Sequence, residues 1–118
     1  MKKTFAIIEI GSNNTKTHIY ENGKAIYDNT TTIEFKKNYA KEEKIVKEDL
    51  EKLYRLITKA KEYTDEIYVY GCSIFRKLNK EELEKLFPNY KHQIKKRKKF
   101  FKSPVTLSEQ DLLYIGYY

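Results

Sequence analysis

The sequence contains a single cysteine, Cys72, and therefore cannot form an internal disulfide. A fold without disulfides suits a reducing compartment, so we expect a cytoplasmic protein. No apolar run reaches the roughly 18 residues that a membrane helix requires, and the run at residues 5–10 is too short for a signal peptide. These absences exclude a disulfide scaffold and a membrane-spanning segment as organising features, and we expect no membrane partner.

Charge, in contrast, is abundant. Charged residues make up 35% of the 118 residues, and the net charge is +7 at pH 7. Residues 91–102, KHQIKKRKKFFK, carry the whole excess, because the other 17 Lys and Arg residues match the 17 acids. Such a cluster attracts a polyanion, through Lys95, Lys96, Arg97, Lys98 and Lys99. A solvated basic strand is the alternative interpretation.

The first third of the chain has the pattern of an antiparallel meander. Residues 4–10 form an apolar run typical of a buried strand, and residues 15–21 predict a second strand. Asn22-Gly23 follows, which favours a two-residue type I′ turn because both positions need a positive φ. Residues 24–35 are rich in Thr, Ile and Tyr and predict the third strand.

The remainder alternates between helix and strand signals. A charged linker is expected at 36–47, an amphipathic helix at 48–63 and a short strand at 67–70. Asn79 and Glu82 have the spacing of a capping box, and Pro88 ends that helix. A basic strand at 92–102 and an apolar helix capped by Ser108 complete the prediction. The result is one α/β domain over residues 1–118, with a mixed sheet in the order β-β-β-α-β-α-β-α.

Three short motifs resemble one known family. IIEIGSNNTKTHIY (7–20), VYGCSIFRKL (69–78) and LSEQDLLYIGYY (107–118) are similar to the ordered signatures of the exopolyphosphatase / guanosine pentaphosphate phosphohydrolase family. The match spans this chain but only the N-terminal subdomain of the family. It implies a ribonuclease-H-like or actin-like ATPase lobe. It also implies a second lobe, which this chain does not contain.

The resemblance assigns phosphate binding to Gly11, Ser12, Asn13 and Arg76. Successive backbone N–H groups in a tight turn form an anion-binding nest, and glycine permits close approach of the ligand. A guanidinium can bond two phosphate oxygens at once. An ordinary hairpin turn and a surface arginine are the alternative interpretations.

Two carboxylates complete the implied site. Glu109 matches the catalytic acid that activates the attacking water, and Glu9 stands where the family has an Asp near a metal-bound phosphate. The resemblance thereby implies Mg²⁺ or another divalent cation, with Glu9 as both a catalytic residue and a metal ligand. The chain departs from the family at Glu9 and at Glu109-Gln110-Asp111, where the family usually has Glu-Ala-Arg. A strand-end acid facing water and a helix-dipole interaction are the respective alternatives.

The functional expectation is the N-terminal lobe of a phosphoanhydride hydrolase acting on polyphosphate or guanosine pentaphosphate. One lobe alone does not enclose a substrate, so we expect weak or no turnover by these 118 residues alone. Expected partners are the polyphosphorylated ligand and a second lobe, partner or second copy of the chain packing on the C-terminal apolar helix. The alternative is a non-enzymatic polyanion- or nucleic-acid-binding module acting through residues 91–102.

Overall fold

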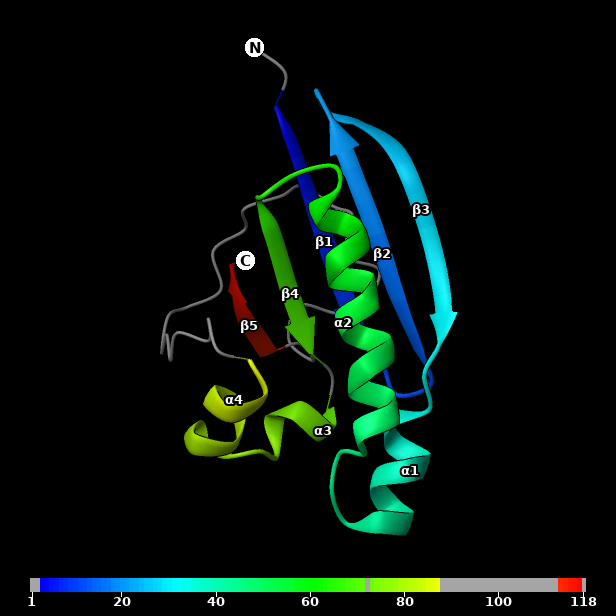
Figure 1. Ribbon diagram of the computed structural model, residues 1–118, viewed down its shortest axis with the longest axis vertical. Coiled ribbons are helices and arrows are strands. Elements are labelled where there is room, and N and C mark those ends of the chain that lie inside the picture. The colour runs from blue at the N-terminus through cyan, green and yellow to red at the C-terminus, as the bar shows by residue number, and fades with distance from the viewer. Residues whose placement is uncertain (1–2, 72, 88–112, 118) are drawn as a thin grey trace.

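The computed structural model describes residues 3–71, 73–87 and 113–117 (Figure 1). Within them a five-stranded sheet has the order β3-β2-β1-β4-β5. Strands β1 and β4 run parallel, and the other neighbours are antiparallel. The α/β class and the mixed sheet are therefore confirmed. The strands are β1 (Thr4–Ile10), β2 (Asn14–Glu21), β3 (Lys24–Thr32), β4 (Ile67–Gly71) and β5 (Leu113–Tyr117), and the helices are α1 (Phe35–Glu42), α2 (Lys47–Lys61), α3 (Ser73–Arg76) and α4 (Lys80–Leu86).

The predicted meander is confirmed, and so is its second turn. Asn22 and Gly23 have φ values of 51° and 83°, as a type I′ turn requires. Beyond this turn the β2–β3 pairing changes register, because Tyr20 pairs with Ala25 whereas Ile19 pairs with Tyr27. Ile26 is thus an extra residue in β3, forming a β-bulge.

Helix α2 lies along one face of the sheet, and α1, α3 and α4 lie toward the lower ends of the strands (Figure 1). Strand β1 alternates its side chains, so that Ala6, Ile8 and Ile10 join the core beneath the helices. Leu53 and Ile57 of α2 are buried against them, which confirms the predicted helix at 48–63 within two residues at either end. The fully buried members of this core are Ala6, Ile8, Ile10, Ile19, Ile33, Leu53, Ala60, Ile67, Val69, Phe75 and Phe87.

The linker expected at 36–47 is wrong, because its first half folds as α1. Phe35 is 1% exposed and Tyr39 packs on the core, so two aromatic residues at i and i+4 anchor about two turns of mostly polar sequence. Glu43 ends the helix in the left-handed conformation, with φ 58°. Tertiary packing, rather than a long apolar stripe, makes this helix.

The helix expected at the C-terminus is also wrong for residues 113–117, which form β5 along the edge of β4. Tyr, Ile and a glycine suit a strand better than a helix, and β4 would otherwise expose its backbone groups at that edge. The expected apolar helix face for a partner to cover is therefore not present in these residues. The expected Ser108 cap, the Pro88 stop and the strand at 92–102 lie outside the described residues.

The short helix α4 confirms the predicted capping box. The Asn79 side chain accepts a hydrogen bond from the Glu82 N–H at 2.8 Å, and the Asn79 N–H donates to Glu82 Oε1 at 3.4 Å. Ser73 begins α3 immediately after β4. Among the helices described here, none has the length and apolar character that crossing a membrane would demand.

Candidate functional site

Parallel pairing brings two of the motif segments to one edge of the sheet. Ile10 at the end of β1 is the register partner of Gly71 at the end of β4. The turn Gly11–Asn13 therefore leaves the sheet beside the segment that carries α3, and Figure 1 shows both near α1. Arg76 is the last residue of α3, and the structure describes its backbone only. The motifs at 7–20 and 69–78 thus meet at the carboxyl edge of β1 and β4.

The turn itself is a tight hairpin connection. The Gly11 N–H donates to the Asn14 carbonyl at 2.8 Å, and a Cβ on Gly11 would lie 2.6 Å from that same oxygen. Glycine is required here by the turn alone, so its presence does not by itself indicate a ligand. Because the Gly11 N–H already donates to the Asn14 carbonyl, an anion at this turn can accept hydrogen bonds from at most the N–H groups of Ser12 and Asn13.

The carbonyl groups of the turn are directed elsewhere. The Ser12 carbonyl accepts from the Lys36 N–H at 3.1 Å, and the Asn13 carbonyl accepts from the Ile33 N–H at 3.2 Å. These bonds tie the turn to the start of α1. They also occupy two oxygens that would otherwise repel an anion.

A cleft of about 430 Å³ lies between α1 and the α3 segment. Lys36 and Lys77 line it from its two sides, and Glu43 contributes one carboxylate. No carboxylate in the described part of the chain forms an ion pair with either lysine. The full lining is Lys36, Tyr39, Ala40, Glu43, Ile74 and Lys77. Two lysines beside a polar turn make a small cationic cleft.

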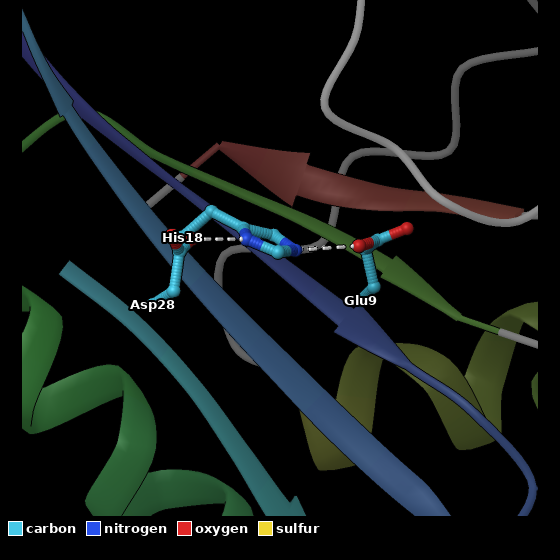
Figure 2. Close-up of polar contacts among 3 residues, drawn as sticks. All are labelled: Glu9, His18 and Asp28. Atoms are coloured by element: carbon cyan, nitrogen blue, oxygen red, sulfur yellow. Dashed lines mark hydrogen bonds and ion pairs between the residues drawn. The ribbon is translucent and has the colours of Figure 1, made fainter. Parts of the chain in front are cut away.

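Glu9 has a different environment from the one expected. Its side chain is 1% exposed, and its Oε2 lies 2.9 Å from His18 Nε2. The other ring nitrogen, Nδ1, lies 2.7 Å from Asp28 Oδ1 (Figure 2). Glu9 on β1, His18 on β2 and Asp28 on β3 thus form one line of hydrogen bonds across three strands. The interpretation of Glu9 as an acid facing water is wrong.

This line lies on the sheet face opposite α2. Ile8 and Ile10 point into the core beneath the helices, so Glu9 between them points the other way. The same face carries aromatic contacts, with Phe5 stacked on Tyr20 at 5.3 Å and set edge-on to Tyr68 at 6.5 Å between ring centroids.

The two carboxylates raise the pKa of His18. The hydrogen bond that the ring donates to Glu9 is the largest cause, burial opposes it, and the hydrogen bond donated to Asp28 and both negative charges add to the increase. An imidazolium donates from both nitrogens, so it can bond to both carboxylates at once. The two contacts therefore favour the form of the ring that carries a proton on each nitrogen.

The sequence gives no metal-ligand spacing that includes His18. Two signals point to it in retrospect. Glu9 is the one charged residue in an otherwise apolar central strand, and a hairpin through residues 11–13 places His18 on the same face, diagonal to Glu9. The link to Asp28 depends on the bulge at Ile26 and could not be found from turn chemistry alone.

The divalent cation implied by the resemblance does not fit the described residues. In that part of the chain, no three His, Cys, Asp or Glu side chains are grouped so as to hold a metal ion. Mg²⁺ needs near-octahedral oxygen ligands, whereas Glu9 Oε2 already accepts from an imidazole. Glu109 and Lys95 to Lys99 lie outside the described residues.

Comparisons with known protein families, with curated proteins and with solved structures give no match to this chain.

Proposed function

We propose that this chain is the N-terminal, ligand-binding lobe of a phosphoanhydride hydrolase of the exopolyphosphatase / guanosine pentaphosphate phosphohydrolase type. The observation that carries the proposal is the pairing of Ile10 with Gly71, which supports one shared site for two of the motifs. Phosphate groups of polyphosphate or of guanosine pentaphosphate bind at this edge, between the turn Gly11–Asn13 and the segment that contains Arg76 and Lys77.

The strand arrangement supports the finer fold assignment. A ribonuclease-H-like or actin-like lobe requires an antiparallel meander followed by a helical crossover to a strand parallel to the first. The order β3-β2-β1-β4, with β4 parallel to β1, agrees with it. In open α/β sheets, ligands bind outside the carboxyl ends of parallel strands, which is where the cationic cleft lies.

The charges in the cleft suit a ligand with several phosphate groups. Lys36 and Lys77 face it from opposite sides, so one lysine can neutralise each of two neighbouring phosphates. Arg76 adds a guanidinium on the same segment as Lys77. Glu43, which also lines the cleft, repels an anion and thereby favours a ligand position nearer the turn.

Turnover requires more than this edge supplies. Hydrolysis of a phosphoanhydride needs an acid or base that positions water, together with donors for the charge on the transferring phosphoryl group. The resemblance assigns the first role to Glu109. The proposed activity of these 118 residues alone is ligand binding with weak or no hydrolysis.

A titration with tripolyphosphate, followed by amide NMR, tests the site. We expect shifts at residues 11–14, 36 and 76–77, and about tenfold weaker binding in the Lys36→Ala/Lys77→Ala variant. The matched control is Lys47→Ala/Lys52→Ala, which removes two exposed lysines of α2 and leaves the affinity unchanged. If the folded protein shows no shift at residues 11–14, the site assignment fails.

The alternative function is a polyanion- or nucleic-acid-binding module that acts through residues 91–102. The concentration of the whole net charge in this window favours it. Changing Lys95, Lys96, Lys98 and Lys99 to Gln, together with Arg97→Gln, would then abolish binding to single-stranded RNA, and affinity for the unmodified chain would fall steeply with salt. Unchanged binding in that variant removes this alternative, and the Lys36→Ala/Lys77→Ala variant serves as its control.

A further inference from the structure

Burial of Glu9 needs an explanation. The residue sits in the central strand, 1% exposed, with Ile8 and Ile10 on either side. An isolated carboxylate in such a place is strongly disfavoured, so it either stays protonated or acquires a positive partner. An ionised Glu9 therefore needs a positively charged group of this chain beside it.

His18 is in the right place to be that partner. Its Nε2 lies 2.9 Å from Glu9 Oε2, and its Nδ1 lies 2.7 Å from Asp28 Oδ1. A neutral imidazole has only one N–H, so its unprotonated nitrogen would face a carboxylate oxygen at hydrogen-bond distance with no proton between them. The doubly protonated ring donates to both, as the directions of the side chains in Figure 2 allow.

The bulge makes this contact with Asp28 specific. If Ile26 paired regularly with Ile19 instead of bulging, Tyr27 would lie opposite His18. Asp28 would then point to the helix-covered face. With the bulge, Tyr27 packs at the core, 5.7 Å from the Tyr63 ring, and Asp28 faces His18. The bulge thus sets which side chain of β3 faces His18.

Other charged and titratable groups near the line are also placed by register. Lys16 of β2 is directly opposite Glu9, and Tyr70 of β4 is its partner on the other side. Tyr20 lies beside His18, with ring centroids 6.5 Å apart. The described groups around the histidine are thus two acids, one lysine and two tyrosines.

We infer that His18 is a built-in cation for Glu9, filling the role that the resemblance gives to a divalent metal ion, so that the Glu9 position binds no metal. This inference goes beyond the proposed function and does not depend on it. A hard cation would have to compete with an imidazolium already bonded to the carboxylate, and would lose much of its water shell to enter a buried site. His18 is therefore a positioning residue, which fixes the charge and direction of the Glu9 carboxylate.

Imidazole NMR provides the first test. The chain has two histidines, so long-range ¹H–¹⁵N spectra contain two ring systems, and His92→Gln assigns them. At pH 6.5 to 7 we expect both His18 ring nitrogens to be protonated, with no nitrogen of the unprotonated type. A single unprotonated nitrogen on His18 would mean a neutral ring and would overturn the inference.

Mn²⁺ provides the second test. We expect no selective broadening of the Glu9, Ile10 and His18 amide signals at Mn²⁺ concentrations up to the millimolar range, with EDTA as the reversal control. Selective broadening of these three signals overturns the inference. The result is independent of tripolyphosphate binding, which is measured at residues 11–14, 36 and 76–77, so either proposal can fail alone.

Two variants separate the charge of His18 from its size. His18→Lys keeps a cation within reach of Glu9, whereas His18→Gln keeps a hydrogen-bond donor without the charge. We expect the lysine variant to retain most of the melting temperature and the glutamine variant to lose several degrees. Equal melting temperatures for the two variants would show that the charge is irrelevant and would contradict the inference.

Discussion

The two faces of the sheet are built on opposite principles. Beneath α2 the strands contribute aliphatic side chains such as Ile8, Ile19 and Val69, all fully buried. On the other face the same strands contribute a hydrogen-bonded line from Glu9 through His18 to Asp28, with aromatic rings beside it. Both faces of β1 are nonetheless buried, since Ile7 is 0% exposed and Glu9 1%.

Strand β1 thus contributes to the apolar core with one face and to the hydrogen-bonded line with the other. The helix-covered face gains stability from buried apolar area, and this contribution does not require the contacting groups to point in particular directions. The opposite face depends on donor and acceptor geometry, which register and bulge must set. We therefore expect changes on the first face to alter stability alone, and changes on the second face to alter stability together with its pH dependence.

The largest effect is expected on the helix-covered face. Phe75 is fully buried, 5.2 Å from the Phe35 ring and 6.0 Å from the Phe87 ring. Phe75→Ala should lower the free energy of unfolding by about 3–5 kcal/mol, through lost burial and a residual cavity. Urea denaturation measures the loss. Ile26→Ala, at a 45% exposed position, is the control and should change stability by less than about 0.5 kcal/mol.

On the opposite face, His18→Ala should cost about 3 kcal/mol, because the buried Glu9 carboxylate loses the charge and the hydrogen bond of the His18 ring. Asp28→Asn should cost less than about 1 kcal/mol, since Asp28 is 59% exposed and solvent screens its charge. The double variant Glu9→Leu/His18→Leu should recover most of the loss. A double variant no more stable than His18→Ala would show that the charge of Glu9 is not the cause.

The turn joining β1 to β2 gives an intermediate effect. Gly11→Ala would put a Cβ 2.6 Å from the Asn14 carbonyl oxygen, and both are tied into the backbone. We expect a loss of about 1–3 kcal/mol in urea denaturation. Gly23→Ala is the matched comparison, since its Cβ would contact nothing within 4 Å although its φ of 83° is unfavourable for alanine. It should cost about 1 kcal/mol. Equal stability of Gly11→Ala and the unmodified chain would contradict the turn geometry.

The smallest effect is expected in the pH dependence of stability, which should come from the face that carries His18. The folded-state pKa of His18 lies above its ordinary value of about 6.5, so the stabilisation is fully present below that pH. It is lost as the pH rises through the folded-state pKa, with a slope of at most about 1.4 kcal/mol per pH unit. Urea midpoints between pH 6 and 9 measure it. His18→Gln should flatten this slope, whereas Phe75→Ala should leave it unchanged.

Much of the fold could be predicted from the sequence because local signals agreed with the tertiary structure. The Asn22-Gly23 turn, the Asn79 cap and the spacing of Leu53, Ile57 and Ala60 each have a local physical cause. Helix α1 and strand β5 were not predicted. Both depend on surfaces supplied by distant parts of the chain, namely the core beneath Phe35 and the free edge of β4.

The candidate site divides in the same way. The meeting of the turn Gly11–Asn13 with α3 follows from the predicted crossover, since parallel strands end at one edge. The environment of Glu9 does not follow from the sequence. It required the hairpin register and the additional residue at Ile26, neither of which a motif of consecutive letters encodes.

The bulge has a consequence for comparing this chain with others. Four residues separate Gly23 from Asp28, and one of them, Ile26, serves only to lengthen the segment. Deleting that residue would remove the bulge, and regular pairing from the Asn22-Gly23 turn would still set the tyrosine opposite Ile19 and the acid opposite His18. Related chains could therefore keep the contact between acid and histidine with segments of two different lengths, and only the strand register reveals that they are equivalent.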